Sequence, residues 1–254
     1  MNNTWLTKLM KVSIIVPTCN RSEYFPRLLK CFQQQTYVDC ELLIYDDTPL
    51  PSSFFDGRAE ENVRYYHSPE RLTIGEKRNF LIEQAQGDVI AHFDDDDYYA
   101  PQYIDFMVQL LGKDYALAKL SGWFIYQVEN RFFGYWDTAN DDENCYMVAP
   151  GQAVQPVFLE GKASSLTGFG FSYVYKKSVY EKVQYQAINF GEDNQFVTDC
   201  FEQGYQLHYA DDPGGLVLHI IHLSNTSRAF PQYEIPEHLV SRLFGTEISE
   251  YIAS

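Results

Sequence analysis

The sequence predicts an α/β fold with a mostly parallel central sheet, and three observations lead to that prediction. Short apolar runs recur at residues 12–16, 41–45, 63–67 and 89–93, each of a length suited to a buried strand. Stretches with helical periodicity separate these runs, which is the alternation expected of a sheet covered by helices. Polar or acidic residues follow the runs, at the edge where open α/β sheets bind ligands. The 254 residues, 45% of them hydrophobic, can form a sizeable core.

The first unit of this pattern is a β-branched strand followed by a polar loop. Residues 12–16 end at Pro17, and Thr18 and Asn20 follow in the loop. A helix is expected next, because apolar residues recur at positions i, i+3, i+4 and i+7. These positions are occupied by Phe25, Leu28, Leu29 and Phe32.

The second and third units place charged residues at the same edge of the sheet. Residues 41–45 end on two aspartates, of which Asp47 could accept a hydrogen bond from a nucleobase or cap the turn. After residues 63–67 we expect a helix that carries Lys77 and Arg78 near its start, where a phosphate group would be favoured. The alternative is that both cations lie on the solvated face of that helix.

The fourth unit contains four consecutive carboxylates. The apolar residues 89–93 run directly into Asp94, Asp95, Asp96 and Asp97. Neighbouring carboxylates repel one another and raise one another's pKa, so they stay ionised together only in open water or around a cation. A solvated acidic turn is one interpretation. The position at the end of a predicted strand favours the other, a site with oxygen ligands for Mg²⁺ or Mn²⁺.

Beyond the acidic cluster the alternation becomes less regular. A helix is expected after Pro101, and residues 131–170 show little periodicity and are expected to be rich in loops. Strands are predicted at residues 117–126, 171–175, 206–209 and 216–221, and helices at residues 177–183 and 192–202. We expect the regular half to bind a common ligand and the irregular half to select a partner.

Two further pairs of residues could carry chemistry. Glu192 and Asp193 lie at a predicted helix start, where carboxylates are favourable as caps on the helix dipole. A carboxylate there could also act as a general base, because it is deprotonated at neutral pH and can take a proton from an attacking hydroxyl. His219 and His222 are spaced to lie on opposite faces of a strand, which argues against a paired metal site. His222, beside a polar loop, is the better candidate for a ligand, and a structural histidine is the alternative.

Composition argues against several classes of protein. The formal net charge of −16 disfavours binding to nucleic acid or anionic lipid by bulk electrostatics. Five scattered cysteines without a CxxC pair indicate neither a disulfide framework nor a zinc site. We recognise no signal peptide and no apolar run long enough to span a membrane. The sequence therefore predicts a cytoplasmic protein, for which peripheral membrane association stays open.

Together these segments resemble the glycosyltransferase family 2 enzymes with a GT-A fold. The resemblance covers roughly residues 11–204 and is carried, in order, by VSIIVPTCNR, ELLIYDDT, GEKRNFLIEQAQGDVIAHFDDDDYYAP and GEDNQFV. It implies a Rossmann-like nucleotide-sugar-binding half at about 11–112 and a more irregular metal and acceptor half at about 113–225. A C-terminal tail segment at 226–254 would complete the single domain of residues 1–254.

The resemblance implies transfer of a sugar, with inversion, from a nucleotide diphosphate donor to the hydroxyl of a glycan or other acceptor. UDP is the most frequent nucleotide in the family. The loop under the nucleotide is matched by Pro17, Thr18 and Asn20. Asp47 matches the aspartate that holds the base, and Asp95 is a candidate partner of the ribose. Lys77 or Arg78 could share the charge of the diphosphate.

The resemblance also assigns the metal and the base. Asp94 and Asp96 match the ends of the DxD motif that binds Mn²⁺ or Mg²⁺, and His222 matches a late metal-binding histidine by approximate position. Asp193 matches the catalytic base, and Glu192 supports it. The metal would neutralise the leaving diphosphate while the base deprotonates the acceptor on the opposite face.

Some features depart from the family pattern. Four consecutive aspartates blur which pair forms the DxD motif, and Asp97 is expected to be structural. The Q-x-x-R-W motif of processive members is absent, which favours addition of one sugar per binding event. Trp123 and Trp136 could stack on an acceptor sugar or belong to the core.

Two other functions fit parts of the same pattern. A catalytically silent GT-A-like module could bind nucleotide or glycan without transfer, although a pure binder needs no base such as Asp193. A sugar-nucleotide nucleotidyltransferase shares the sheet, but resembles G-x-G-T-R-L after the first strand, where this chain has PTCNR.

Overall fold

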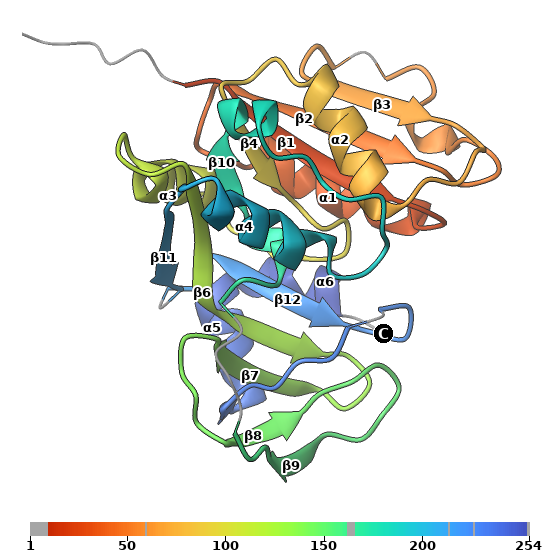
Figure 1. Cartoon of the computed structure of the whole chain (residues 1–254). Coiled ribbons are helices and arrows are strands. Elements are labelled where there is room, and N and C mark those ends of the chain that lie inside the picture. Colours follow the sequence, from red (N-terminus) through yellow and green to blue (C-terminus); the bar gives the residue numbers. More distant parts are fainter. Residues whose placement is uncertain (1–9, 59, 162–165, 213, 226, 253–254) are drawn as a thin grey trace, which may run out of the picture.

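The computed structural model describes residues 10–58, 60–161, 166–212, 214–225 and 227–252. At its centre lies a mixed sheet of eleven strands, whose main path has the order β13-β7-β6-β10-β4-β1-β2-β3 (Figure 1). Both halves of the chain contribute to this one sheet, because β10 joins β4 of the first half to β6 of the second.

The first half forms the parallel part of the sheet, as the sequence predicts. β1 pairs in parallel with both β2 and β4, and β2 pairs in parallel with β3. The bounds are β1 Val12–Thr18, β2 Cys40–Asp46, β3 Val63–His67 and β4 Val89–His92. Parallel pairing brings the carboxyl ends of these strands to one edge, so the acidic cluster after β4 lies beside the loop after β1.

The second half extends the sheet in both orientations around the long strand β6. The strands β11 and β12 pair with β6 in parallel, whereas β7 and β10 pair with it antiparallel, and the short β5 pairs with β12. The bounds are β5 Tyr98–Tyr99, β6 Leu117–Gln127, β7 Phe132–Asp137, β10 Val174–Lys176, β11 Leu207–Asp211, β12 Val217–Ile221 and β13 Tyr233–Ile235.

Residues 131–170 contain more regular structure than the sequence predicts. They include β7 and a separate antiparallel pair, β8 (Asn144–Met147) and β9 (Gln155–Phe158). The greater part of its described residues lies in turns and loops, so the segment is loop-rich as expected, but it also contains three strands that were not predicted. β8 and β9 are half-exposed and lack apolar alternation, so they carry no periodic signal of their own.

Helices cover both faces of the sheet, with α2 and α4 on one face and α1 and α3 on the other (Figure 1). Their bounds are α1 Phe25–Gln33, α2 Ile74–Gln84, α3 Tyr103–Leu111, α4 Glu192–Glu202, α5 Val240–Phe244 and α6 Ser249–Ile252. The helix predicted at residues 177–183 is instead a 3₁₀ turn at Lys177–Glu181. None of the helices in the described part of the chain is both long and apolar enough to cross a lipid bilayer.

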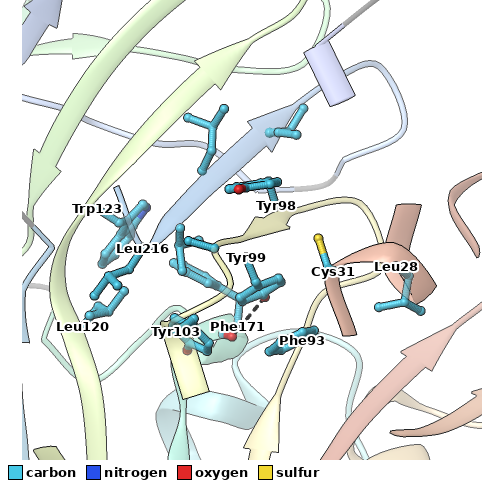
Figure 2. Close-up of a cluster of buried hydrophobic side chains, with 14 of the residues drawn as sticks. Leu28, Cys31, Phe93, Tyr98, Tyr99, Tyr103, Leu120, Trp123, Phe171 and Leu216 are labelled. Carbon is cyan, nitrogen blue, oxygen red and sulfur yellow. Dashed lines mark hydrogen bonds between the residues drawn. The ribbon is translucent and has the colours of Figure 1, made fainter. Parts of the chain in front are cut away.

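The larger hydrophobic cluster lies on the α1 and α3 face and contains stacked aromatic rings (Figure 2). Phe93 and Tyr99 stack with ring centroids 3.8 Å apart, directly beneath the acidic cluster. Trp123 and Trp136 are 0% and 2% exposed, so both belong to the core and neither presents a free face to a sugar.

The C-terminal segment packs back onto α1. The carbonyl of Tyr251 accepts a hydrogen bond from Arg27 at 3.0 Å, and the Tyr251 hydroxyl lies 3.3 Å from the Cys31 sulfur. Lys30 pairs with Glu247 and Glu250 at 2.9 and 3.0 Å. The described part of residues 226–254 is therefore integrated with the nucleotide-side helix α1.

Candidate active site

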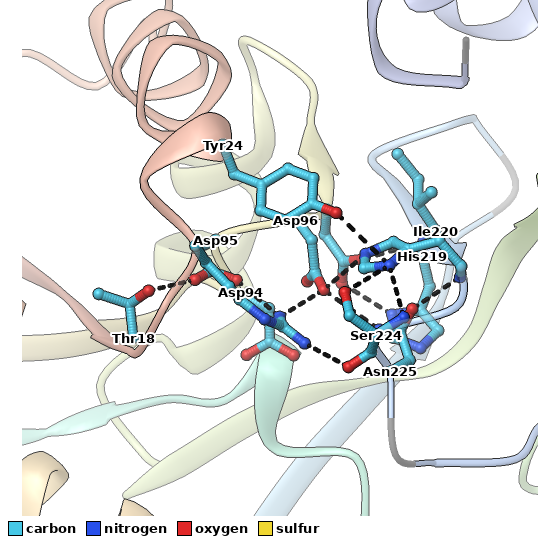
Figure 3. A network of polar contacts seen from close by, with 12 residues as sticks. Thr18, Tyr24, Asp94, Asp95, Asp96, His219, Ile220, Ser224 and Asn225 are labelled. Atoms are coloured by element: carbon cyan, nitrogen blue, oxygen red, sulfur yellow. Dashed lines mark hydrogen bonds and ion pairs between the residues drawn. The ribbon is translucent and has the colours of Figure 1, made fainter. Parts of the chain in front are cut away.

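The acidic cluster contacts the end of β1 and the loop that follows it. The Thr18 hydroxyl donates to Asp95 at 2.5 Å, and the Arg21 guanidinium contacts Asp95 at 2.9 Å and Asp96 at 2.6 Å (Figure 3). Arg21 also donates to the carbonyl of Ser224 at 3.0 Å. One arginine thus connects the ends of β1 and β4 with the loop after β12, a role that the sequence analysis did not assign.

Asp96 and Asp97 are both held by β12 and the loop after it. The Asp96 carboxylate lies 3.0 Å from His222 Nε2 and accepts from the Asn225 amide at 3.1 Å (Figure 3). The Asp97 carboxylate contacts His219 Nδ1 at 2.8 Å and accepts from the amide of Ile220 at 2.9 Å. The two histidines therefore bind different aspartates.

Burial and crowding shift the pKa values within the cluster. Burial, with the charges of Asp97 and Asp96, raises the pKa of Asp94 to about 8. Burial and Asp96 raise the pKa of Asp95 to about 6 despite Arg21. Burial also acts on Asp96, but the His222 bond and the Arg21 charge hold its pKa below the usual range. Such a cluster retains excess negative charge at neutral pH, which a cation relieves.

A divalent cation fits the positions of these carboxylates. Asp94, Asp96 and Asp97 each offer an oxygen, and the three oxygens lie within 4.8 Å of one another. Hard carboxylate oxygens are suited to Mg²⁺ and Mn²⁺. Asp97 has one contact on each oxygen, from His219 and Ile220, whereas the contacts of Asp96 to Arg21, His222 and Asn225 all fall on its Oδ2 atom.

Asp47 and Lys77 form a buried ion pair at the ends of β1 and β2. Lys77 Nζ donates to Asp47 at 2.6 Å and to the carbonyl of Thr18 at 2.9 Å. Asp47 also accepts from the amide of Leu72 at 3.0 Å and lies 3.3 Å from Arg71 Nη1. Burial opposes ionisation of Asp47, but the Lys77 bond holds its pKa below the ordinary value. Lys77 is therefore not the solvated residue that one interpretation of the sequence expected.

Arg78 is buried between the two acidic groups of the site. It donates to Glu192 at 2.5 Å, and its charge acts on Asp193 and on Asp94. Its Nε atom has no partner among the described residues. Arg78 thus lies where the acidic cluster and the start of α4 approach each other, and it is not solvated either.

The amides at the start of α2 are occupied by the protein itself. Ile74 donates to the Asn189 side chain at 3.1 Å, and Gly75 donates to the carbonyl of Ile188 at 3.3 Å. Thr73 and Glu76 form a reciprocal capping box. A phosphate at this site would meet the side chains of the helix, because its first amides are already bonded.

Asp193 lies at the start of α4, where the backbone of Gly170 closely approaches its side chain. Its carboxylate accepts from the amide of Gly170 at 2.8 Å and from the amide of Asn194 at 2.7 Å. A Cβ on residue 170 would lie 2.8 Å from the Cβ of Asp193, so any residue larger than glycine would have to displace the Asp193 side chain. The sequence carries little signal for this role of Gly170, because the partner is 23 positions away.

The loop under the expected nucleotide is tied to the end of β2. Pro17 is in register with Tyr45 across the β1–β2 pair. Asn20 adopts a left-handed conformation with φ of 54°, and its amide donates to the Thr48 hydroxyl at 2.7 Å. The structure thus brings the residues predicted for the nucleotide, Pro17, Thr18, Asn20, Asp47, Lys77 and Asp95, to one edge of the sheet.

A fold of this kind, with an acidic cluster at the ends of its parallel strands, is typical of enzymes that bind nucleotides. The family model described as Glycosyl transferase family 2 matches residues 13–179. This chain belongs to that family.

Two curated relatives illustrate the similarity. EpsH of Bacillus subtilis is 27% identical over 179 residues, covering 67% of this chain and 48% of the relative. A protein of Campylobacter jejuni, named GalNAc(5)-diNAcBac-PP-undecaprenol beta-1,3-glucosyltransferase, is 28% identical over 116 residues, covering 42% of this chain and 36% of the relative. The chain therefore spans about half or less of the length of these relatives.

Solved structures confirm the GT-A fold. S. aureus TarS in complex with UDP-GlcNAc has a TM-score of 0.59 and 16% identity, covering 86% of this chain and 62% of the other. The mannosyltransferase PcManGT from Pyrobaculum calidifontis, in complex with GDP-Man and Mn²⁺, has a TM-score of 0.58 and 14% identity. The match covers 84% of this chain and 57% of the mannosyltransferase. At these identities the likeness concerns the fold.

Proposed function

We propose that this protein transfers a sugar, with inversion, from a nucleotide diphosphate donor to an acceptor hydroxyl, in a reaction that depends on a divalent metal. A UDP-sugar is the first choice of donor. The observation that carries the proposal is the direct contact of the acidic cluster with the end of β1, through Thr18, and with the loop after it, through Arg21. A nucleotide on that loop would have its diphosphate beside the four carboxylates.

The donor would lie along the ends of β1, β2 and β4. Pro17, Thr18 and Asn20 form the loop under the nucleotide, Asp47 faces the base and Asp95 faces the ribose. Structures with this fold bind UDP-GlcNAc and GDP-Man, which supports a nucleotide sugar as the donor class. The position of Arg78 between the acidic groups supports a role in sharing the diphosphate charge.

The metal would be held by Asp94 and Asp96, with His222 completing its ligands. His222 already lies 3.0 Å from the Asp96 carboxylate, so a small rearrangement would let both bind one ion. A bound Mn²⁺ or Mg²⁺ supplies positive charge that stabilises the leaving diphosphate. Asp97 keeps its structural bonds to β12 in this arrangement.

Asp193 would act as the general base, with Glu192 in support. Its carboxylate is fixed by two amides, and a carboxylate can take the proton of an acceptor hydroxyl that attacks the anomeric carbon. Glu192 is bonded to Arg78, which keeps that cation close to the base without pairing directly to it.

A thermal-shift screen of UDP-sugars, GDP-mannose and other nucleotide sugars, with and without Mn²⁺, tests this proposal. We expect one donor to raise the melting temperature only with the metal, because a ligand that binds the folded state stabilises it. Replacement of Asp94 and Asp96 by asparagine should abolish the metal-dependent part of that shift. Shifts that are indifferent to EDTA, or no shift with any nucleotide sugar, would contradict the proposal.

A further inference from the structure

The direction of the Asp193 carboxylate depends on a neighbouring segment. One of its oxygens accepts from the amide of Asn194, within the first turn of the same helix. The other accepts from the amide of Gly170, at the start of a 3₁₀ turn that spans Gly170–Ser172. Because the second bond comes from outside α4, the position of the Gly170 amide sets where this carboxylate points.

The same residue is held on its other side by a buried histidine at the end of β4. The carbonyl of Gly170, which belongs to the next peptide along the chain, lies 2.9 Å from Nδ1 of His92 and also accepts from the amide of Tyr173 at 3.1 Å. A carbonyl oxygen only accepts, so Nδ1 carries the proton and Nε2 is the acceptor. The hydroxyls of Tyr175 and Tyr185 lie 3.3 Å from Nε2 and complete its bonds. Both ring nitrogens are therefore occupied, and the orientation of the imidazole is fixed.

Further bonds fasten the same segment to β4 and its extension. The amide of His92 donates to the carbonyl of Tyr173 at 2.9 Å. The Tyr99 hydroxyl donates to the carbonyl of Phe171 at 3.1 Å (Figure 2) and accepts from the amide of Asp94 at 2.8 Å. The strand that presents the acidic cluster therefore also supports the segment that holds Asp193.

We propose that His92 is a positioning residue for Asp193, and that through the backbone of Gly170, whose two flanking peptides contact the two side chains, it sets the geometry of this carboxylate relative to the acidic cluster. The inference rests on the proposed role of Asp193 as the base. His92 is buried and lies behind the peptide, so it acts through Gly170 and not on the reacting atoms. A histidine that only fills the core would affect stability without a separate effect on turnover.

Three variants test this role. His92→Asn keeps an N–H donor near the position of Nδ1, whereas His92→Leu keeps the bulk and loses the donor. His208→Leu is the matched control, since His208 Nδ1 also lies 2.6 Å from a backbone carbonyl, that of Leu110, but on β11 and outside the site. Hydrogen exchange of the Gly170 amide should be about tenfold faster or more in His92→Leu and near wild type in the other two. Unchanged protection in His92→Leu would overturn the proposal.

Turnover gives the second readout, measured as nucleotide release from UDP-GlcNAc and from GDP-mannose with Mn²⁺. We expect His92→Leu to lower kcat about tenfold or more while the donor KM stays nearly unchanged. In His92→Asn, kcat should return most of the way to the wild-type value. An equal loss in His208→Leu would show a general effect on the fold and refute the positioning role. If wild type binds neither donor, the proposed function fails, and the exchange measurement still decides the role of His92.

Gly170→Ala covers the case in which His92→Leu does not fold. This change leaves His92 in place, but its Cβ would collide with that of Asp193. We expect a folded protein with lowered kcat and unchanged nucleotide affinity. A Gly170→Ala variant with wild-type kcat would show that turnover does not depend on the Gly170 peptide, and the proposal would fall.

Discussion

At the scale of single residues, Arg21 stabilises the acidic cluster when no metal ion is bound. Its guanidinium contacts Asp95 and Asp96 at 2.9 and 2.6 Å and replaces part of the charge that a cation would supply. Metal binding must compete with this arginine or move it. Arg21 is therefore expected to tune metal affinity as well as stability.

Replacement of Arg21 by alanine tests this interpretation. We expect a lower melting temperature in EDTA, because the carboxylates lose their counter-ion, and a larger upward shift on addition of Mn²⁺ than in the wild type. Differential scanning fluorimetry in EDTA and in Mn²⁺ measures both. Arg242→Ala, at an exposed position on α5, is the control and should change neither value. Identical Mn²⁺ shifts in the wild type and in Arg21→Ala would contradict the role.

The Asp97–His219 pair predicts a pH dependence of stability. Burial alone would lower the pKa of His219, but Asp97 outweighs it and raises that pKa to about 9. The folded protein therefore binds this proton more tightly than the unfolded chain does. The contribution is fully present below pH 6.5 and is lost as the pH rises through about 9. The raised pKa of Asp94 acts in the same direction up to about pH 8.

Urea unfolding of the metal-free protein at pH 6.5 and pH 9 measures this dependence. The free energy of unfolding should fall with rising pH in the wild type and fall less in His219→Gln, which cannot gain or lose that proton. Parallel pH profiles for the two proteins would show that the His219 pair contributes nothing to the dependence.

At the scale of elements, α2 connects the nucleotide side of the site to the base. Lys77 reaches from it to Asp47, Arg78 reaches to Glu192, and its first amides bind the loop before α4. The start of this helix must therefore be held firmly. The capping box of Thr73 and Glu76 provides that hold.

Loss of the capping box should lower the free energy of unfolding. Thr73→Ala removes a side-chain acceptor for the Glu76 amide and should lower the free energy of unfolding by about 1 kcal/mol. Thr198→Ala, at an exposed position in the middle of α4, is the control and should be neutral or slightly stabilising, because alanine favours helix interiors. Equal effects of the two changes in chemical denaturation would argue against the cap.

How far the sequence predicts each element depends on the range of the contacts that form it. The strands and helices of the first half were predicted because each βα unit has its own periodicity and turn. β8 and β9 were missed because they are short, partly exposed and without apolar alternation. β13 is also short and exposed, and it pairs with β7, a strand far earlier in the chain. The short helices α5 and α6 likewise pack through long-range contacts such as Arg27 to Tyr251.

The residues of the candidate site also divide into those with a local sequence pattern, which were predicted, and those whose role depends on long-range contacts, which were not. The aspartates were predicted because four of them are adjacent in the chain, and the resemblance to the family pointed to Asp47 and Asp193. The buried pairs of Lys77 with Asp47 and of Arg78 with Glu192 were not predicted, since they join residues 30 and 114 positions apart. Arg21 and His92 were missed as well, because a role that depends on a partner so far along the chain leaves no local pattern.

At the scale of the whole molecule, one continuous sheet connects the donor side with the rest of the site. β10 joins the parallel first half to β6, and β12 brings His219 and the loop with His222 to the acidic cluster. The C-terminal segment packs against α1 and closes the back of the nucleotide side. The residues proposed for the metal, the donor and the base therefore belong to one folding unit. A mutation in one of these three groups is nevertheless expected to affect mainly the function of that group.

The most direct test of the central claim, metal-dependent transfer with Asp193 as the base, is a comparison of nucleotide binding with transfer in Asp193→Asn. We expect Mn²⁺-dependent affinity for the donor close to wild type and a loss of kcat of about 10²- to 10⁴-fold. Asp199→Asn, on the same helix α4 and bonded to Gln195, is the matched control and should retain both. Transfer by Asp193→Asn at the wild-type rate would contradict the account.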